Sequence, residues 1–218
     1  RREAAIRRGV MAVLDVGSHK ISCLVLQFSL EEPEAGAPDV TVPKMGSFRV
    51  TGVGRVRSRG VKFGEVVDMA ETERAIRSAV QKAQKMANLR VDNAIVSFAG
   101  GRPRSYGLEG AVEVEQGEVT ERDIGRFLAD CDVPPYGYVR EAVHALPVNF
   151  TLDHRSGLTD PRGQVGVKLS VDMHMLTLAG APVYDLIECV QRCDLEVAGL
   201  SFAGFASGVS TLMENEQQ

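Results

Sequence analysis

The sequence predicts an α/β fold that is interrupted by an inserted α+β unit. Residues 1–89 read as strand, strand, strand and helix, and residues 173–218 return to alternating helix and strand. Between them, residues 90–172 show the order strand, helix, strand, strand, which suits a small unit with its own core. We therefore expect residues 1–89 and 173–218 to form one domain, which is split by a second domain over residues 90–172.

Three strands and one long helix are predicted in the first part of the chain. The strands are the apolar runs Val10–Leu14, Ile21–Phe28 and Arg49–Val56. The helix begins after Asp68, which suits an N-cap because a glutamate follows three residues later. Its apolar residues recur at the helical period, and it should end near Asn88.

The inserted unit is predicted from a strand over Asn93–Ala99, a helix and two extended segments. Thr120 caps the helix, which runs to about Cys131 and is followed by two prolines. The extended segments are Arg140–Phe150 and Val167–Leu178, with a polar turn region between them.

The last part of the chain returns to the α/β pattern. A helix over Pro182–Cys193, a buried strand over Val197–Phe202 and a helix over Gly204–Met213 follow one another. The polar segment Glu214–Gln218 comes directly after the last helix. This arrangement leaves the sheet without a partner half, so we expect the sequence to be part of a longer protein.

Composition and charge argue against several kinds of protein. Of the 218 residues, 44% are hydrophobic, which is ordinary for a globular protein. Lys and Arg number 25 against 29 Asp and Glu, and the net charge of -4 gives no support to nucleic-acid binding. The four cysteines lack zinc-ligand spacing, and no apolar run reaches membrane-spanning length. We expect a cytoplasmic protein with reduced thiols; its basic start, Arg1–Arg8, could touch an anionic membrane and is more often a solvated tail.

The segment Val13–Ile21 has the pattern of a phosphate-binding turn. It consists of a strand, a tight turn and a second strand, with Gly17 where the backbone turns or lets a ligand approach. Backbone N–H groups in such a turn can bind phosphate, and Lys20 adds a positive charge. Asp15, at the end of the first strand, could hold a hydrated Mg²⁺ through water. A plain β-hairpin with a solvent-facing lysine has the same pattern, so this segment alone leaves both interpretations open.

Several further segments accompany this turn, in an order that extends along nearly the whole chain. They are Gly52-Val53-Gly54, Ser58–Val61, Val66–Asp68, Ile95–Gly101, Val119–Asp123, His144–Pro147, Leu158–Gly163 and Phe202–Ser207. Together with Leu14–Lys20, they resemble FtsA, a bacterial cell-division family of the actin superfamily.

The resemblance implies an actin-like (ribonuclease H-like) subdomain 1A that is split by an inserted α+β domain, called 1C or SHS2. Residues 1–89 and 173–218 would form 1A, and residues 90–172 would form 1C. The first phosphate loop of this family binds ATP, and Asp15 would hold Mg²⁺ through water. The loop residues that match it are Asp15, Gly17, Ser18, His19 and Lys20.

The same resemblance implies a function for the whole protein. It would be an ATP-binding adaptor at the inner face of the cell membrane, at the septum, that links FtsZ polymers to the membrane. It would also assemble into polymers and recruit later divisome proteins such as FtsN through 1C. The second phosphate loop, the FtsZ-contacting subdomain and the C-terminal membrane helix of FtsA have no counterpart in this sequence. Ala203 and Gly204 stand where related proteins carry a catalytic acid, so at most a slow ATPase is expected.

Two groups of charged residues in the inserted unit are candidate partner contacts. Glu118, Glu121 and Asp123 lie near the start of the helix. An acidic first turn is explained by the helix dipole, and it could also meet a basic partner tail. Arg102 and Arg104 are loop charges that the resemblance makes candidate polymer contacts.

Two other functions stay open. A pilus-assembly actin homologue shares a 1C-like insert. A small-molecule kinase of the same superfamily would need a catalytic carboxylate facing a cleft, and the sequence offers no obvious candidate.

Overall fold

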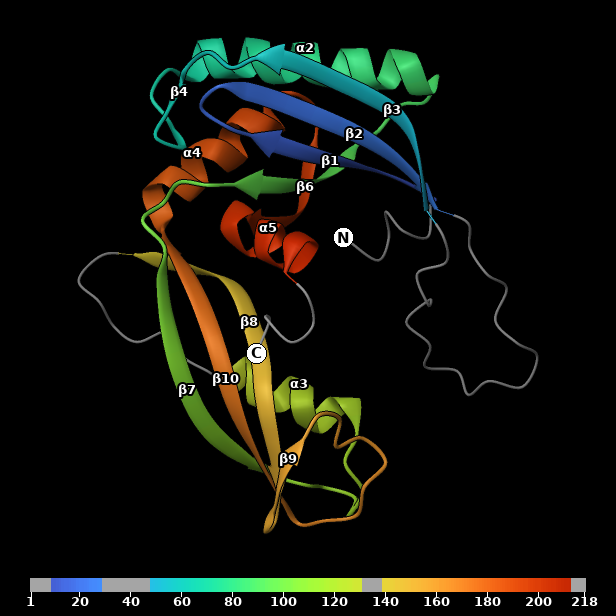
Figure 1. Ribbon diagram of the computed structural model, residues 1–218, viewed down its shortest axis with the longest axis vertical. Coiled ribbons are helices and arrows are strands. Elements are labelled where there is room, and N and C mark those ends of the chain that lie inside the picture. Colours follow the sequence, from blue (N-terminus) through green and yellow to red (C-terminus); the bar gives the residue numbers. More distant parts are fainter. Residues whose placement is uncertain (1–8, 29–47, 131–138, 213–218) are drawn as a thin grey trace. The chain divides into compact units, whose positions relative to one another are not determined.

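The computed structural model describes residues 9–28, 48–130 and 139–212, which divide into two compact units (Figure 1). The first unit consists of the chain up to Gly101 and of the chain from Ala181 onward. The second unit is Arg102–Gly180. Both boundaries lie later than the predicted residues 90 and 172. The physical reason is strand pairing: β6 (Asn93–Phe98) pairs with a strand of the first unit, and β10 (Lys168–Ala179) stays in the second sheet to its end.

The first unit contains a five-stranded mixed sheet with the order β11-β6-β1-β2-β3. The hairpin β1–β2 and the edge strand β3 are antiparallel, whereas β6 runs parallel to both β1 and β11. The carboxyl ends of β1, β6 and β11 therefore meet at one edge of the sheet. The remaining bounds are β1 Val10–Val16, β2 Lys20–Phe28, β3 Phe48–Arg57 and β11 Glu196–Phe202.

Helix α2 (Met69–Ala87) covers β2 and β3, and it begins and ends as predicted. The Asp68 carboxylate accepts a 3.0 Å hydrogen bond from the backbone N–H of Glu71, and Asn88 closes the helix in the left-handed conformation with φ 52°. The glycines of β3 let α2 lie unusually close. A Cβ atom at Gly54 would stand 1.9 Å from the carbonyl oxygen of Ala79, so no side chain fits there.

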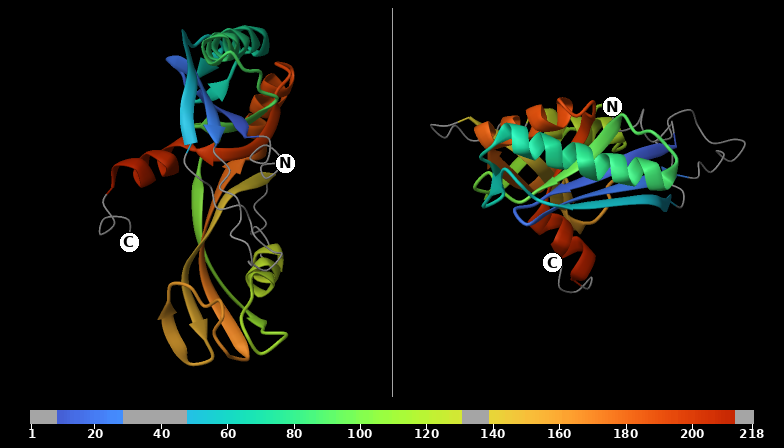
Figure 2. Two further views of the ribbon diagram at one scale, coloured as in Figure 1. Left: turned by 90° about the vertical axis from the view of Figure 1, so that its right-hand side faces the viewer. Right: turned by 90° about the horizontal axis from the view of Figure 1, so that it is seen from above.

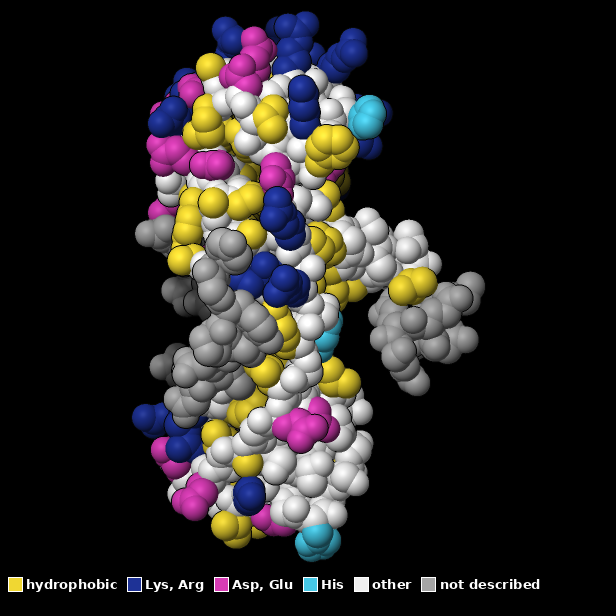
Figure 3. All heavy atoms as spheres, turned by 90° about the vertical axis from the view of Figure 1, so that its left-hand side faces the viewer, with side chains coloured by type: hydrophobic (Ala, Val, Ile, Leu, Met, Phe, Trp, Pro, Cys, Tyr) yellow, Lys and Arg dark blue, Asp and Glu magenta, His cyan; other side chains and the backbone are white. Residues whose placement is uncertain are grey.

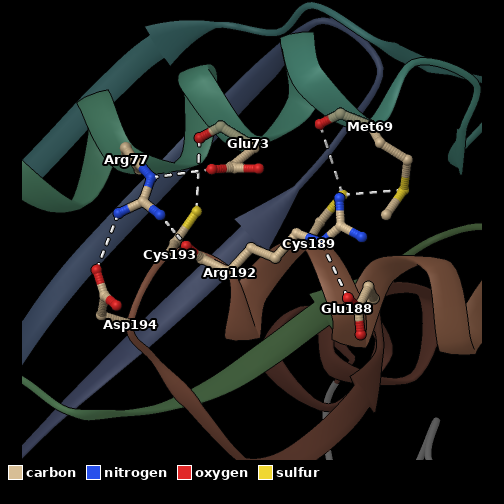
Figure 4. Close-up of polar contacts among 8 residues, drawn as sticks. All are labelled: Met69, Glu73, Arg77, Glu188, Cys189, Arg192, Cys193 and Asp194. Carbon is tan, nitrogen blue, oxygen red and sulfur yellow. Dashed lines mark hydrogen bonds and ion pairs between the residues drawn. The ribbon is translucent and has the colours of Figure 1, made fainter.

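Helix α4 (Gly180–Gln191) packs against α2 through sulfur atoms and one arginine (Figure 4). The Cys189 Sγ atom lies 3.4 Å from the Met69 Sδ atom, and Cys193 Sγ lies 3.5 Å from the backbone oxygen of Glu73. Arg77 of α2 holds the chain just after α4 by donating to the Asp194 carboxylate and to the backbone oxygen of Arg192. It also donates to the carboxylate of Glu73 on its own helix. The last helix, α5 (Ala203–Thr211), extends from the sheet on the side away from α2 (Figure 2).

The second unit is a four-stranded antiparallel sheet with the order β7-β10-β8-β9 and one helix, α3 (Glu121–Asp130). Its core lies between α3 and one face of the sheet. The core contains Val114, Val119, Ile124, Phe127, Phe150, Leu152, Leu169, Val171, Met173 and Met175. The strands are β7 Arg104–Glu113, β8 Arg140–Leu152, β9 Arg155–Leu158 and β10. Strand β9 lies in the region that the sequence predicted as a polar turn.

Candidate functional site

The predicted phosphate turn lies at the carboxyl ends of the parallel strands. It joins β1 to β2, next to the end of β6. Open sheets with parallel strands bind ligands at this edge, because the loops that leave the strands there can surround a ligand. The structure thus brings the predicted turn to the edge where a ligand site is expected.

The turn residues Gly17–Lys20 offer donors that the described residues do not use. The backbone N–H of Gly17 donates to the Lys20 carbonyl oxygen at 3.1 Å, which closes the hairpin. The backbone N–H groups of Ser18 and His19 donate to no acceptor within the described part of the chain. Gly17 does not adopt a positive φ. A Cβ atom at this position would stand 3.2 Å from the Lys20 carbonyl oxygen, so the glycine allows the backbone of residues 17 and 20 to approach closely.

A second hairpin, β4 (Val61–Lys62) and β5 (Glu65–Val66), braces this turn. Its Gly64 backbone N–H donates to the Ser18 hydroxyl at 2.9 Å. The backbone N–H of Ser58 donates to the His19 oxygen at 3.0 Å, which fixes the other side of the turn. Because the Ser18 oxygen accepts from Gly64, its own O–H remains available to donate to a ligand.

Strand register places several polar side chains on one face of the first sheet. Asp15 of β1 pairs with Ser22 of β2, and Ser22 pairs with Arg55 of β3. Lys20 pairs directly with Arg57. Directly paired residues point to the same face of a sheet, so this row gathers Asp15 with the basic side chains, on the face away from the buried Leu14 and Val16.

Arg55 and Arg57 are functional candidates that the sequence prediction missed. The signal was present in β3, where Gly52, Gly54 and Val56 alternate with Val53, Arg55 and Arg57. The glycines face α2, so the arginines face the opposite side. Within the described ranges, no hydrogen bond or ion pair engages the side chains of the three bases Lys20, Arg55 and Arg57.

Figure 3 shows Lys and Arg side chains gathered on the first unit, near the top of the view.

A cavity of about 670 Å³ lies at the edge of the first sheet that is opposite the predicted phosphate turn. It is lined by residues at the amino ends of the parallel strands and by α2, including Val10, Arg77, Gln84 and Asp92. No predicted site residue lines it, and it is separate from the phosphate turn.

Asp123, predicted to be part of a partner surface, is instead buried, and this corrects the prediction. Its carboxylate accepts from the Thr120 backbone N–H at 2.9 Å and hydroxyl at 2.6 Å, and pairs with Arg126 at 2.7 Å. Burial raises the pKa of Asp123, but the hydrogen bonds from Thr120, Arg126 and the Glu115 backbone outweigh it and bring the pKa to about 2. Asp123 therefore caps the start of α3, and Thr120, which precedes the helix, is its hydrogen-bond partner.

The other four predicted partner residues do not form one surface. Glu118 and Glu121 are exposed beside α3, and Glu121 pairs with Arg162 at 3.0 Å. Arg102 and Arg104 are exposed at the other end of β7. A strand of this length spans roughly 30 Å, so the basic and acidic groups are separate contacts.

Two comparisons identify the relatives of this chain. Residues 100–177 match the SHS2 domain inserted in FtsA. The cell division protein FtsA of Rhizobium meliloti is 34% identical over 96% of this chain, and that of Pseudomonas aeruginosa is 32% identical over 99%. The resemblance to FtsA is confirmed. FtsA of Escherichia coli strain K12 is 26% identical over 98% of the chain. The chain spans about half the length of these FtsA relatives, between 47% and 48%.

The fold is confirmed as well. A solved structure, the PilM-PilN type IV pilus biogenesis complex, matches 91% of this FtsA-like chain and 49% of its own chain with a TM-score of 0.56. At 11% sequence identity this likeness shows the fold alone. Together with the SHS2 match, it establishes an actin-like α/β domain with an inserted SHS2 domain. Among the helices that the structure describes, none is long and apolar enough to cross a membrane.

Proposed function

We propose that this FtsA-like chain contributes the first phosphate turn of an actin-like, ATP-binding cell-division adaptor. The name and similarity of its curated relatives support a role in cell division. The observation that carries the nucleotide part is the turn Gly17–Lys20. Among the described residues, this turn combines two backbone N–H groups without an acceptor, a Ser18 hydroxyl held by Gly64, and a lysine without an ion-pair partner, at the carboxyl edge of the parallel strands.

The residues present suit one side of a polyphosphate site. Backbone N–H groups and Lys20 can bind phosphate oxygens, and the Ser18 hydroxyl can donate a further hydrogen bond. No described group of three or more His, Cys, Asp or Glu side chains could enclose a metal ion. In the proposed site, Asp15 of β1 would hold a hydrated Mg²⁺ through water, because hard cations prefer oxygen ligands. The base of the nucleotide has no contact surface assigned in this chain, and we expect it to bind to the part of FtsA that lies beyond the matched half.

Slow ATP hydrolysis, or none, fits this site. Strand β11 ends at Phe202 and α5 starts with Ala203 and Gly204, so neither of these two residues supplies a carboxylate to orient water. In the proposed role, ATP binding therefore acts as an assembly switch.

The proposed partners follow from the FtsA relatives. The whole protein would link FtsZ polymers to the inner face of the membrane at the division site, through parts that this chain does not match. The SHS2 unit would recruit later division proteins such as FtsN and support self-assembly. Its exposed Glu118 and Glu121, and separately Arg102 and Arg104, are the candidate contacts. A pilus-assembly role is the second candidate, and only the fold likeness favours it.

A titration of Mg-ATP tests the nucleotide part of this proposal. The 218-residue chain is compared with a chimera that joins it to the second half of the Pseudomonas aeruginosa relative. We expect weak binding by the chain and clear binding by the chimera, with a loss on Lys20→Ala. A chimera that folds but binds no ATP would show that the turn is a plain hairpin. Tight binding by the short chain would contradict a cleft that is shared with a second half.

A further inference from the structure

We propose that Arg57 and Lys20 form a two-cation clamp for a polyphosphate, in which Arg57 is the additional contact. This inference rests on the proposed function and extends it to β3, a strand outside the phosphate-loop motif. It starts from the register, which pairs Lys20 directly with Arg57 across the β2–β3 ladder. Side chains of such a pair share one face, with Cβ atoms roughly 5 Å apart.

The pairing of two like charges is unfavourable unless an anion lies between them. Like charges directly opposite in a sheet destabilise it, because they are held close on the same face. Both side chains are exposed, and neither forms an ion pair with any residue in the described ranges. The Asp15 carboxylate lies on this face, but it belongs to the row of Ser22 and Arg55. A bound polyphosphate would neutralise both cations at once.

The local backbone holds this pair in a fixed position. Ser58, the residue after Arg57, donates its backbone N–H to the carbonyl oxygen of His19, the residue before Lys20, at 3.0 Å. The antiparallel register therefore extends past the strand end into the phosphate turn. A site whose groups are already positioned loses less entropy when it binds a ligand.

Arginine and lysine have complementary roles in such a clamp. The guanidinium of Arg57 can make two parallel hydrogen bonds to phosphate oxygens, whereas the Lys20 ammonium acts as a compact charge. Arg55 lies two residue pairs further from the turn, opposite Ser22, and adds a third positive charge on the same face. The chemistry selects a ligand with several adjacent negative oxygens, such as the triphosphate of a nucleotide.

Tripolyphosphate binding by the 218-residue chain tests the clamp directly. We expect Arg57→Gln to weaken binding about ten-fold at low ionic strength, the effect of losing a hydrogen bond between charged groups. Lys20→Gln should weaken it similarly. Arg49→Gln is the matched control, because Arg49 lies on the same strand, is exposed, and pairs with the neutral Gln27. The control should bind as the wild type does, and added salt should reduce the difference between the variants.

Thermal unfolding without ligand tests the repulsion between Lys20 and Arg57 independently of ligand affinity. Removing one of two repelling charges should raise the melting temperature of the Arg57→Gln variant by about 2 °C at low salt, and Arg49→Gln should leave it unchanged. If Lys20→Gln weakens binding and Arg57→Gln does not, the clamp is wrong while the phosphate turn stands. If the wild-type chain binds no tripolyphosphate at low salt, the clamp is overturned in this chain. ATP binding by the chimera then decides the proposed function separately.

Discussion

The Ser18 hydroxyl accepts a 2.9 Å hydrogen bond from the backbone N–H of Gly64, 46 residues later in the chain. This bond joins the predicted phosphate turn to the β4–β5 hairpin, which leads into the N-cap of α2. Gly64 also packs against the backbone at the end of β6, since a Cβ atom there would stand 2.7 Å from the Gly100 nitrogen. The predicted turn is thus held by the β4–β5 hairpin, which in turn packs against the residues that follow β6.

Replacing Ser18 should loosen this connection in a graded way. Ser18→Ala removes the acceptor and leaves the Gly64 N–H unpaired, so we expect a loss of about 1 kcal/mol of stability. Ser18→Thr keeps the hydroxyl and should be close to the wild type. Hydrogen exchange of the Gly64 amide, measured by NMR, should be faster in the alanine variant alone. Equal exchange in the alanine variant and the wild type would show that the bond does not protect this amide.

Gly54→Ala should strongly destabilise the first unit. The new methyl group would stand 1.9 Å from the Ala79 oxygen, so α2 would have to move away from β3. Forced overpacking of this kind costs about 1–3 kcal/mol. Gly107→Ala is the control, because nothing lies within 4 Å of its Cβ position and its φ is not positive. Thermal unfolding followed by circular dichroism compares the two, and equal melting temperatures would contradict the close packing of α2 on β3.

The second unit should lose stability in acid through Asp123. Its pKa in the folded chain is about 2, below the ordinary value of 3.8, so the folded state favours the ionised carboxylate. The stabilisation is complete above the ordinary value and is lost as the pH falls through 3.8 towards 2. We expect Asp123→Asn to reduce the acid sensitivity of the SHS2 unit, whereas Glu109→Gln, which removes an exposed carboxylate of β7, should not. Urea unfolding at pH 6 and pH 3 measures how much unfolding free energy each protein loses in acid. An equal loss in the wild type and both variants would refute the prediction.

The buried thiols should resist alkylation in the folded chain. Burial raises the pKa of Cys23, Cys189 and Cys193 to about 11, so almost no thiolate is present at pH 8. Iodoacetamide should label them slowly in buffer and completely in urea, as mapped by mass spectrometry of peptides. Cys131 lies outside the described residues, and the prediction does not extend to it. Rapid native labelling of Cys189 would indicate that α4 does not pack on α2.

Hydrophobic periodicity and capping residues were enough to predict most elements. Asp68 and Asn88 gave the ends of α2, and Thr120 gave the start of α3. These features are local, because a cap or a repeat depends on residues within a turn or two of the chain. Motif order along the chain also predicted the actin-like domain and the inserted SHS2 unit, which the comparisons confirm.

Tertiary structure decided the features that depend on pairing between distant segments. The sequence could not show that Asn93–Phe98 belongs to the first sheet, because its apolar run suits a buried strand in either unit. It also could not show that Asp123 is buried, since an acidic first turn is usually exposed. The pairing of Lys20 with Arg57 depends on a register between strands that residues 29–47 separate in sequence. Local sequence sets which residues form a strand, but only the packed sheet sets which side chains face one another.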